Sequence, residues 1–174
     1  MKKLIIVSTL IILLLMNSGC AIYHHYDPYY GQLVDAETKQ PLEGAVVLAH
    51  YVTYQHLSPG GPVPHFLDTQ EVVSDKKGEF AIPALNAFSF RAFSTFKPDP
   101  YFMIFKPKYN CAENAAVSEN KYDVIELREL KTREERIANH CFPTSVPKNR
   151  MIKFIEMVNM EEIDLGFTPY TIRK

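Results

Sequence analysis

The stretch that decides the fold is residues 31–54, which read GQLVDAETKQPLEGAVVLAHYVTY. Residues 31–35 alternate between apolar and polar side chains and predict a short strand, and residues 36–41 supply a polar turn. Gly44 breaks the pattern before residues 45–54, a β-branched and aromatic run long enough for a full strand. The stretch therefore predicts two strands of a mainly β protein.

The sequence that follows predicts more short strands separated by turn signals. Residues 75–78 form a predicted hairpin turn, in which Gly78 supplies the positive φ that such turns need. Residues 55–65 hold three prolines and two adjacent glycines, so they predict a loop. The other predicted strands are residues 66–74, 79–82, 89–95, 101–105 and 122–127. Seven short strands with turns between them predict a β-sandwich.

Three motifs in this region resemble those of carboxypeptidase regulatory-like domains. They are Gly31-x-Leu-Val-Asp35 with Thr38 and Pro41-Leu42-x-Gly44-Ala45-x-Val47, then Ser74-Asp75-x-x-Gly78-x-Phe80-x-Ile82, then Phe105-Lys-Pro-Lys-Tyr109. Lys108 stands where the family usually has glycine. The resemblance covers roughly residues 29–127 and implies a seven-stranded transthyretin-like (prealbumin-like) sandwich. Regulatory-like domains carry no zinc ligands of their own, so the resemblance implies a non-catalytic module.

The N-terminus has the layout of an export signal. Two lysines precede an apolar run, residues 4–16, which is too short for a bilayer span of roughly 20 residues. Asn17-Ser-Gly-Cys20 resembles the end of a bacterial lipoprotein signal peptide, although an aliphatic residue is usual where Asn17 stands. The resemblance implies cleavage after residue 19 and lipidation of Cys20, palmitate included. The alternatives are an uncleaved anchor helix and ordinary cleavage that leaves Cys20 a free thiol.

These features divide the chain into four parts. The predicted parts are a signal peptide (1–19), a tether rich in tyrosine and histidine (20–30), the β-sandwich (31–127) and a helical appendage (128–174). The tether either lies near the bilayer, where tyrosine rings are common, or packs on the domain. In a Gram-negative host, Ala21 after the lipidated cysteine indicates the outer membrane, with the protein facing the periplasm.

The C-terminal part is predicted to contain a pair of α-helices. Thr132-x-x-Glu135 is a capping-box pattern that opens a helix over residues 133–140. A second helix is predicted from residue 147 to about residue 163. Its apolar residues recur at helical spacing and form one stripe: Met151, Phe154, Ile155 and Val158. We expect this stripe to pack on the sandwich, and a docking face for a partner is the alternative.

Cysteine and charge counts are consistent with an exported protein. The chain has three cysteines, and lipidation of Cys20 leaves Cys111 and Cys141 as an even pair. A disulfide closing that loop of about 31 residues would contribute roughly 3–4 kcal/mol in the chain-entropy model, and two separate thiols are the alternative. The mature chain carries 17 basic and 20 acidic residues without a basic cluster, which disfavours nucleic-acid binding.

Motifs for catalysis or metal binding are not evident. His50, His56 and His65 flank one predicted loop, but neither HxH nor HExxH spacing occurs, so we expect neither a metal nor a cofactor. Serine nucleophile motifs are missing as well. Transthyretin-like hydrolases end in Tyr-Arg-Gly-Ser, a tail that this chain lacks, so a hydrolase relative is the weakest alternative.

Binding is the remaining function class. The predicted loop offers an aromatic surface made by Tyr54, His56, His65 and Phe66, which suits a glycan or the edge of another protein. A variable surface insertion is the alternative. The sequence thus predicts a lipid-anchored envelope protein that is attached to the membrane through Cys20 and acts as a non-catalytic binding or scaffolding module. The alternative function is an exported carbohydrate-binding protein that uses residues 54–66.

Overall fold

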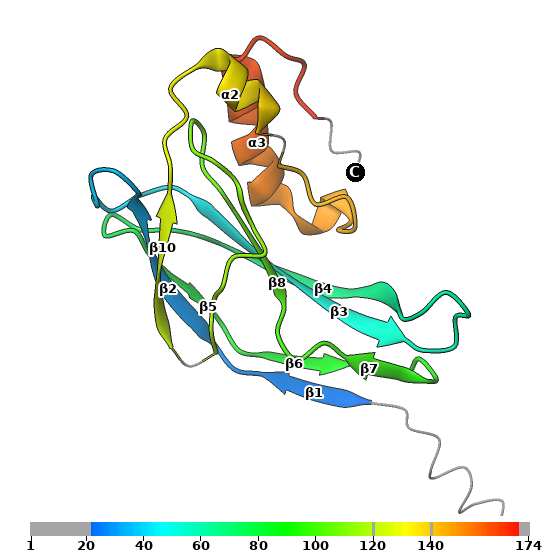
Figure 1. Cartoon of the computed structure of the whole chain (residues 1–174). Helices are drawn as coiled ribbons and strands as arrows, with labels where there is room; N and C mark the ends of the chain where they lie inside the picture. The colour runs from blue at the N-terminus through cyan, green and yellow to red at the C-terminus, as the bar shows by residue number, and fades with distance from the viewer. Residues whose placement is uncertain (1–21, 120, 140, 171–174) are drawn as a thin grey trace, which may run out of the picture.

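The structure is a computed structural model that describes residues 22–119, 121–139 and 141–170. The predicted signal peptide and the lipidation residue Cys20 lie outside the described residues. The described chain is mainly β, with helices only near its C-terminal end (Figure 1). It contains ten strands rather than the seven expected, because short pairings at the edges were not anticipated.

The strands build two larger sheets and one small one. Their bounds are β1 Tyr23–Tyr26, β2 Tyr29–Asp35, β3 Val46–Gln55, β4 Val63–Val73, β5 Glu79–Ile82, β6 Leu85–Phe88, β7 Ser94–Phe96, β8 Tyr101–Phe105, β9 Ala112–Glu113 and β10 Tyr122–Leu127. One sheet has the order β10-β2-β5, with β10 parallel to β2. The other has the order β4-β3-β8-β9, with β7 also paired to β3. Strands β1 and β6 pair antiparallel.

The main core lies between the two larger sheets. Alternate residues of each strand point inward, as the two-residue period of a strand requires. Leu33 of β2 and Ile82 of β5 meet Val47 of β3 and Ile104 of β8 in this core, and all four are fully buried. The sheets therefore pack face to face, and the sequence alternation selects which side chains they share.

The opposite face of the β3 sheet is half covered by a helix. The helical segments are α2 Arg133–Ala138, a 3-10 turn at Lys148–Arg150 and α3 Ile152–Asp164. Val46 and Leu48 of β3 pack with Phe154 and Ile155 of α3 in a second apolar cluster. Met151 and Val158 belong to the same cluster, so the predicted apolar stripe packs on the sheet as expected.

A carboxylate from the sheet caps the first turn of α3. Within the described residues, the side chain of Met151, the N-cap residue of α3, makes no capping hydrogen bond. Instead Glu71 of β4 accepts hydrogen bonds from the backbone N–H groups of Phe154 (2.8 Å) and Lys153 (3.2 Å). A negative group at a helix N-terminus also interacts favourably with the helix dipole. Burial raises the pKa of Glu71 above its ordinary value, and the backbone hydrogen bonds oppose that shift.

The turn motifs of the sequence occupy the positions that their chemistry predicts. Gly78 has a φ of +72°, and a Cβ there would lie 2.3 Å from the carbonyl oxygen of Leu33. Asp75 accepts hydrogen bonds from the N–H groups of Lys77 (2.8 Å) and Glu79 (2.9 Å), which closes the predicted turn. The turn connects β4 to β5 in the other sheet, so the expected hairpin pairing of these two strands is wrong. Lys108 has φ +70, a left-handed conformation that favours glycine.

Two predicted boundaries around the β3–β4 hairpin and β6 are wrong. The loop predicted at residues 55–65 is shorter, because β3 runs to Gln55 and β4 begins at Val63. Pro64 lies within β4, which is tolerated because β4 is an edge strand and needs fewer backbone donors. The strand predicted at residues 89–95 is mostly wrong, because β6 ends at Phe88 and β7 begins only at Ser94, so residues 89–93 connect the two strands.

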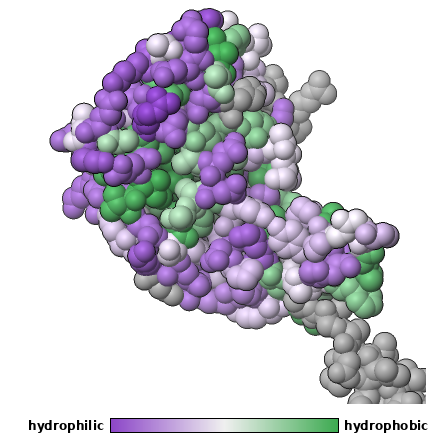
Figure 2. All heavy atoms as spheres, viewed as in Figure 1, coloured by the Kyte–Doolittle hydropathy of each residue, from purple (hydrophilic) through white to green (hydrophobic). Residues whose placement is uncertain are grey.

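The described part of the predicted tether belongs to the domain. Residues 23–26 form β1, and β2 begins at Tyr29. Tyr26 and Tyr29 are fully buried in the main core, so this segment packs on the domain. The β structure therefore starts before the predicted boundary at residue 31. Tyr23 remains exposed at the β1 end of the molecule, where Figure 2 shows hydrophobic surface.

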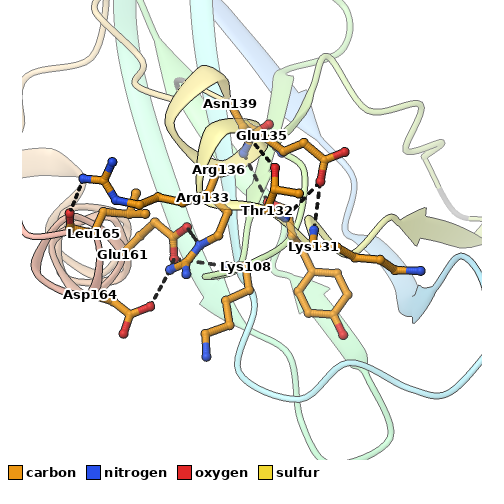
Figure 3. Close-up of polar contacts among 12 residues, drawn as sticks. Lys108, Lys131, Thr132, Arg133, Glu135, Arg136, Asn139, Glu161, Asp164 and Leu165 are labelled. Carbon is orange, nitrogen blue, oxygen red and sulfur yellow. Dashed lines mark hydrogen bonds and ion pairs between the residues drawn. The ribbon is translucent and has the colours of Figure 1, made fainter.

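The two α-helices are joined by a cluster of charged side chains (Figure 3). Arg136 of α2 donates two hydrogen bonds to the carboxylate of Glu161, at 2.7 and 2.8 Å, and one to Asp164 at 2.6 Å. The N–H of Lys108 also donates to Glu161 (3.1 Å). The predicted capping box is confirmed, since Thr132 and Glu135 bond to each other's backbone N–H groups. The cluster fixes the short helix α2 against α3.

We predict that Arg136→Met lowers the free energy of unfolding by about 2–3 kcal/mol. The change leaves the Glu161 carboxylate, whose side chain is only 10% exposed, without its main partner. The loss is smaller than the roughly 3–5 kcal/mol of a fully buried pair, because Glu161 keeps the N–H of Lys108 as a donor. Arg128→Met is the control, since its ion pair with Glu135 is exposed on both sides and should contribute less than about 1 kcal/mol. Urea titration compares the variants, and equal losses would contradict the assigned role of Arg136.

Candidate binding cavity

The uncovered half of the β3 sheet face forms the floor of a cavity. Residues of β3 that point to this face alternate with core residues, so Leu48, His50 and Val52 follow one another along it. Phe66 lies opposite Val52 on β4, and Tyr101 lies opposite His50 on β8. The cavity has a volume of about 570 Å³. Its floor is therefore built from three neighbouring strands.

A segment between the two helices forms the other wall. This wall consists of Phe142, Pro143, Thr144 and Ser145, and it faces Glu113 and Asn114 at the β9 side. Cys111, beside β9, and Cys141, next to Phe142, form the predicted disulfide with their Cα atoms 5.8 Å apart. Asn139 strengthens the same junction, because its side chain accepts from the N–H of Cys111 (3.0 Å) and donates to the carbonyl of Tyr109 (3.2 Å). The disulfide thus ties this wall to the sheet.

His50 is the polar group that most clearly distinguishes the cavity. Its side chain is 7% exposed, and among the described residues its Nε2 atom has no hydrogen-bond partner. A buried polar atom without a partner costs roughly 1–3 kcal/mol, so such atoms are uncommon in folded proteins. Burial also lowers the pKa of His50, which keeps the ring neutral at neutral pH. A neutral ring at this position can donate or accept one hydrogen bond.

Aromatic side chains surround His50 within the cavity. Its ring stacks on Phe66, with centroids 5.8 Å apart, and lies 6.2 Å from the ring of Tyr101. The hydroxyl groups of Tyr101 and Tyr54 are hydrogen-bonded to each other. This bond is the main cause that raises the pKa of Tyr101, so the phenol stays neutral. The arrangement provides flat apolar faces around one hydrogen-bonding nitrogen.

The structure separates the four predicted ligand residues. Phe66 lines the cavity, and Tyr54 supports it through Tyr101. His56 instead lies beyond the end of β3 and contacts the hydroxyl of Thr95 at 2.8 Å, and His65 contacts the side chain of Gln55 at 3.1 Å. Neither histidine lines the cavity. The four residues therefore do not all line this cavity, and the predicted recognition loop stays a prediction.

Sequence reasoning missed most of the cavity residues. His50 and Val52 share a face with Val46 and Leu48, which the alternation of β3 could have shown. Placing Tyr101 in the cavity depends on the pairing of β3 with β8, and placing Phe142 there depends on the docking of α3 on the sheet. A different cluster, Cys111, Glu113 and Cys141, holds three possible metal-ligand atoms within 4.8 Å in the described chain. Both sulfur atoms of that cluster belong to the disulfide.

Comparisons with known proteins give little further information. No protein-family model matches the chain, and no curated protein matches it. Among solved structures, the chain is similar to the C-terminal domain of the shaft pilin SpaA from Lactobacillus rhamnosus GG, with 19% identity and a TM-score of 0.30 over 61% of this chain and 98% of that one. It is also similar to a 9R-lipoxygenase from Cyanothece PCC8801, with 15% identity and a TM-score of 0.28 over 57% of this chain and 16% of that one. Both similarities are too weak to assign a function.

Proposed function

We propose that the protein is a lipid-anchored component of a bacterial cell envelope, a non-catalytic module that binds a small ligand in the cavity above β3. The fold would be the transthyretin-like sandwich of carboxypeptidase regulatory-like domains. The turn positions of Gly44 and Gly78 and the left-handed Lys108 support that resemblance. The lipid on Cys20 would hold the module at the membrane. Within the part of the chain that the structure describes, no helix has the length and hydropathy to cross a bilayer.

The observation that carries the binding proposal is the unpartnered Nε2 atom of His50 within an aromatic cavity. Binding sites for small molecules are mostly apolar and contain a few polar groups that fix orientation. The ligand would have an apolar or aromatic body that packs on Phe66, Tyr101 and Met103. It would also carry one group that exchanges a hydrogen bond with His50.

A carbohydrate is the second candidate ligand. Glu113, Asn114 and Ser145 place polar groups at the edge of the cavity, close to the aromatic faces of Phe66 and Tyr101. Sugar rings present apolar C–H faces and hydroxyl edges, so a mixed lining of this kind suits them. This candidate retains the predicted class of ligand but moves it from the β3–β4 loop to the sheet face.

We expect a small aromatic probe to bind this cavity saturably. The probe is 8-anilinonaphthalene-1-sulfonate, which has an apolar ring system and a hydrogen-bond acceptor. In protein with 13C-labelled methionine methyl groups, the Met103 signal should shift, whereas that of Met160, exposed on α3, should not. His50→Leu keeps the apolar volume but removes the ring nitrogens, and it should weaken binding about 3- to 10-fold. His56→Leu is the matched control and should leave binding unchanged.

A second titration with an N-acetylglucosamine trimer separates the two ligand classes. A shift of Met103 with the saccharide and none with the aromatic probe would favour the carbohydrate candidate. If neither probe moves the Met103 signal, or if His56→Leu weakens binding as much as His50→Leu, the cavity is not the binding site.

A further inference from the structure

A second surface, at the β1 end of the molecule, is unusually apolar. We call it the apolar tip, and its exposed apolar side chains are Ile22, Tyr23, Leu57, Val63, Phe88, Phe90 and Phe93. Phe90 is 83% exposed, Leu57 61% and Phe88 60%. Figure 2 shows hydrophobic surface at this end, and Figure 1 shows that the helices lie at the other end. Contiguous exposed apolar surface on a protein marks an interaction site more often than isolated apolar residues do.

The residues of the apolar tip are held together by the β structure. Strand β1 pairs with β6, so the rings of Tyr23 and Phe88 lie 5.1 Å apart. The N–H of Ser89 donates to the carbonyl of Ile22 at 3.0 Å, which continues that pairing. The turn after β3 joins the same end, because the N–H of His56 donates to the carbonyl of Phe93 at 3.0 Å. The tip is therefore a built surface rather than a set of unrelated loops.

The apolar tip carries few charged residues, and the nearest carboxylate in the sequence is that of Asp27, which pairs with His25 at 3.3 Å. Its three segments, residues 22–26, 55–63 and 86–97, contain none of the chain's 20 acidic residues. They contain Arg91 and Lys97, of which the Lys97 ammonium group lies over the ring of Tyr101, 4.5 Å from its centroid. Aromatic rings together with basic side chains suit the boundary of a bilayer, where headgroup phosphates lie above the hydrocarbon. This composition fits a lipid surface better than it fits a basic protein partner.

The position of the tip along the chain indicates which membrane it meets. Ile22 follows the predicted lipidation residue Cys20 by two positions, and two extended residues span at most about 7 Å. We propose that the apolar tip inserts its aromatic side chains into the headgroup region of the bilayer that holds the Cys20 lipid. This inference rests on the proposed lipid anchor. It adds a second membrane contact and directs the helical end of the molecule away from the bilayer.

A single introduced tryptophan tests this contact, because the chain contains none. Phe90→Trp places the reporter on the tip, and Ile163→Trp, at an exposed position of α3, is the matched control. Lipidated full-length protein is reconstituted in vesicles of phosphatidylcholine and phosphatidylglycerol with bromine near the top of the acyl chains. We expect the position-90 fluorescence to shift to the blue and to lose at least half its intensity, with little change at position 163. Equal, weak quenching at both positions would overturn the proposal.

Mass analysis of the N-terminal peptide from the same sample separates this result from the anchor itself. An acylated peptide with no quenching at position 90 refutes the tip contact and leaves the anchor in place. If acyl mass is missing, the anchor fails, and the unlipidated protein is then titrated with excess brominated vesicles. Quenching at position 90 in that titration supports the tip contact, and no quenching refutes it. A blue shift without vesicles, together with a dimer in sedimentation, would assign the tip to a second copy instead.

Discussion

Phe154→Ala should lower the free energy of unfolding by about 3–5 kcal/mol, the largest single effect that we expect in this protein. Phe154 is fully buried between α3 and the β3 sheet, and its ring lies 5.9 Å from that of Phe105. Truncation would leave a cavity among side chains that two different elements hold in place. The sheet and helix cannot both move inward to fill it, so most of the lost packing energy would remain lost.

Urea unfolding of the purified protein measures this loss, with Ile163→Ala as the control on the same helix. Ile163 is 62% exposed, so its truncation should change stability by less than about 0.5 kcal/mol. Phe154→Leu should recover part of the loss, because it keeps an apolar side chain at the site. If Phe154→Ala and Ile163→Ala have similar stabilities, α3 does not pack on the sheet through its apolar stripe.

The second large effect concerns the disulfide. Replacing both Cys111 and Cys141 with serine should cost about 3–4 kcal/mol, because the bond closes a loop with a sequence separation of 30. The same loop carries α2, and the bond ties the end of that segment to Cys111, the residue directly before β9. Removing the bond mainly increases the conformational entropy of the unfolded chain. The lost stability should therefore appear mainly as a lower unfolding midpoint.

Reduction provides the control for this prediction. Dithiothreitol should destabilise the wild-type protein by about the same amount as the double replacement, and it should not destabilise the double variant further. Amide hydrogen exchange should also become faster in the cavity wall, residues 142–145, because the bond restrains that segment. Equal stability of the oxidised and reduced proteins would show that the bond contributes nothing to folding.

Several strands were predictable because their local signals agree with their final environment. The strands at residues 79–82, 101–105 and 122–127 match the prediction in both bounds. The turn before residues 79–82 is marked by Gly78, which adopts the positive φ that the turn needs. The capping box at Thr132 was predictable for the same reason, since every group that it needs lies within four residues.

The remaining elements depend on contacts that local sequence does not record. β1 exists because residues 85–88 pair with it, and those residues lie about sixty positions away. Pro64 is a loop signal by itself, and only the edge position of β4 makes it acceptable in a strand. The cavity could be anticipated only in part, because its wall comes from the segment after Cys141. The docking of that segment depends on the burial of Phe154 and on the disulfide.

The parallel pairing of β2 with β10 has a consequence for how the protein acquires its fold. β2 lies between β5 and β10, and its residue Tyr30 pairs with Tyr122, far along the chain. A chain that emerges N-terminus first presents β2 and β5 early, whereas β10 arrives only after most of the domain has emerged. Pairings of long sequence separation form slowly. The edge of β2 that β10 later covers therefore stays unpaired until most of the domain has emerged, and during that interval it can pair with another chain.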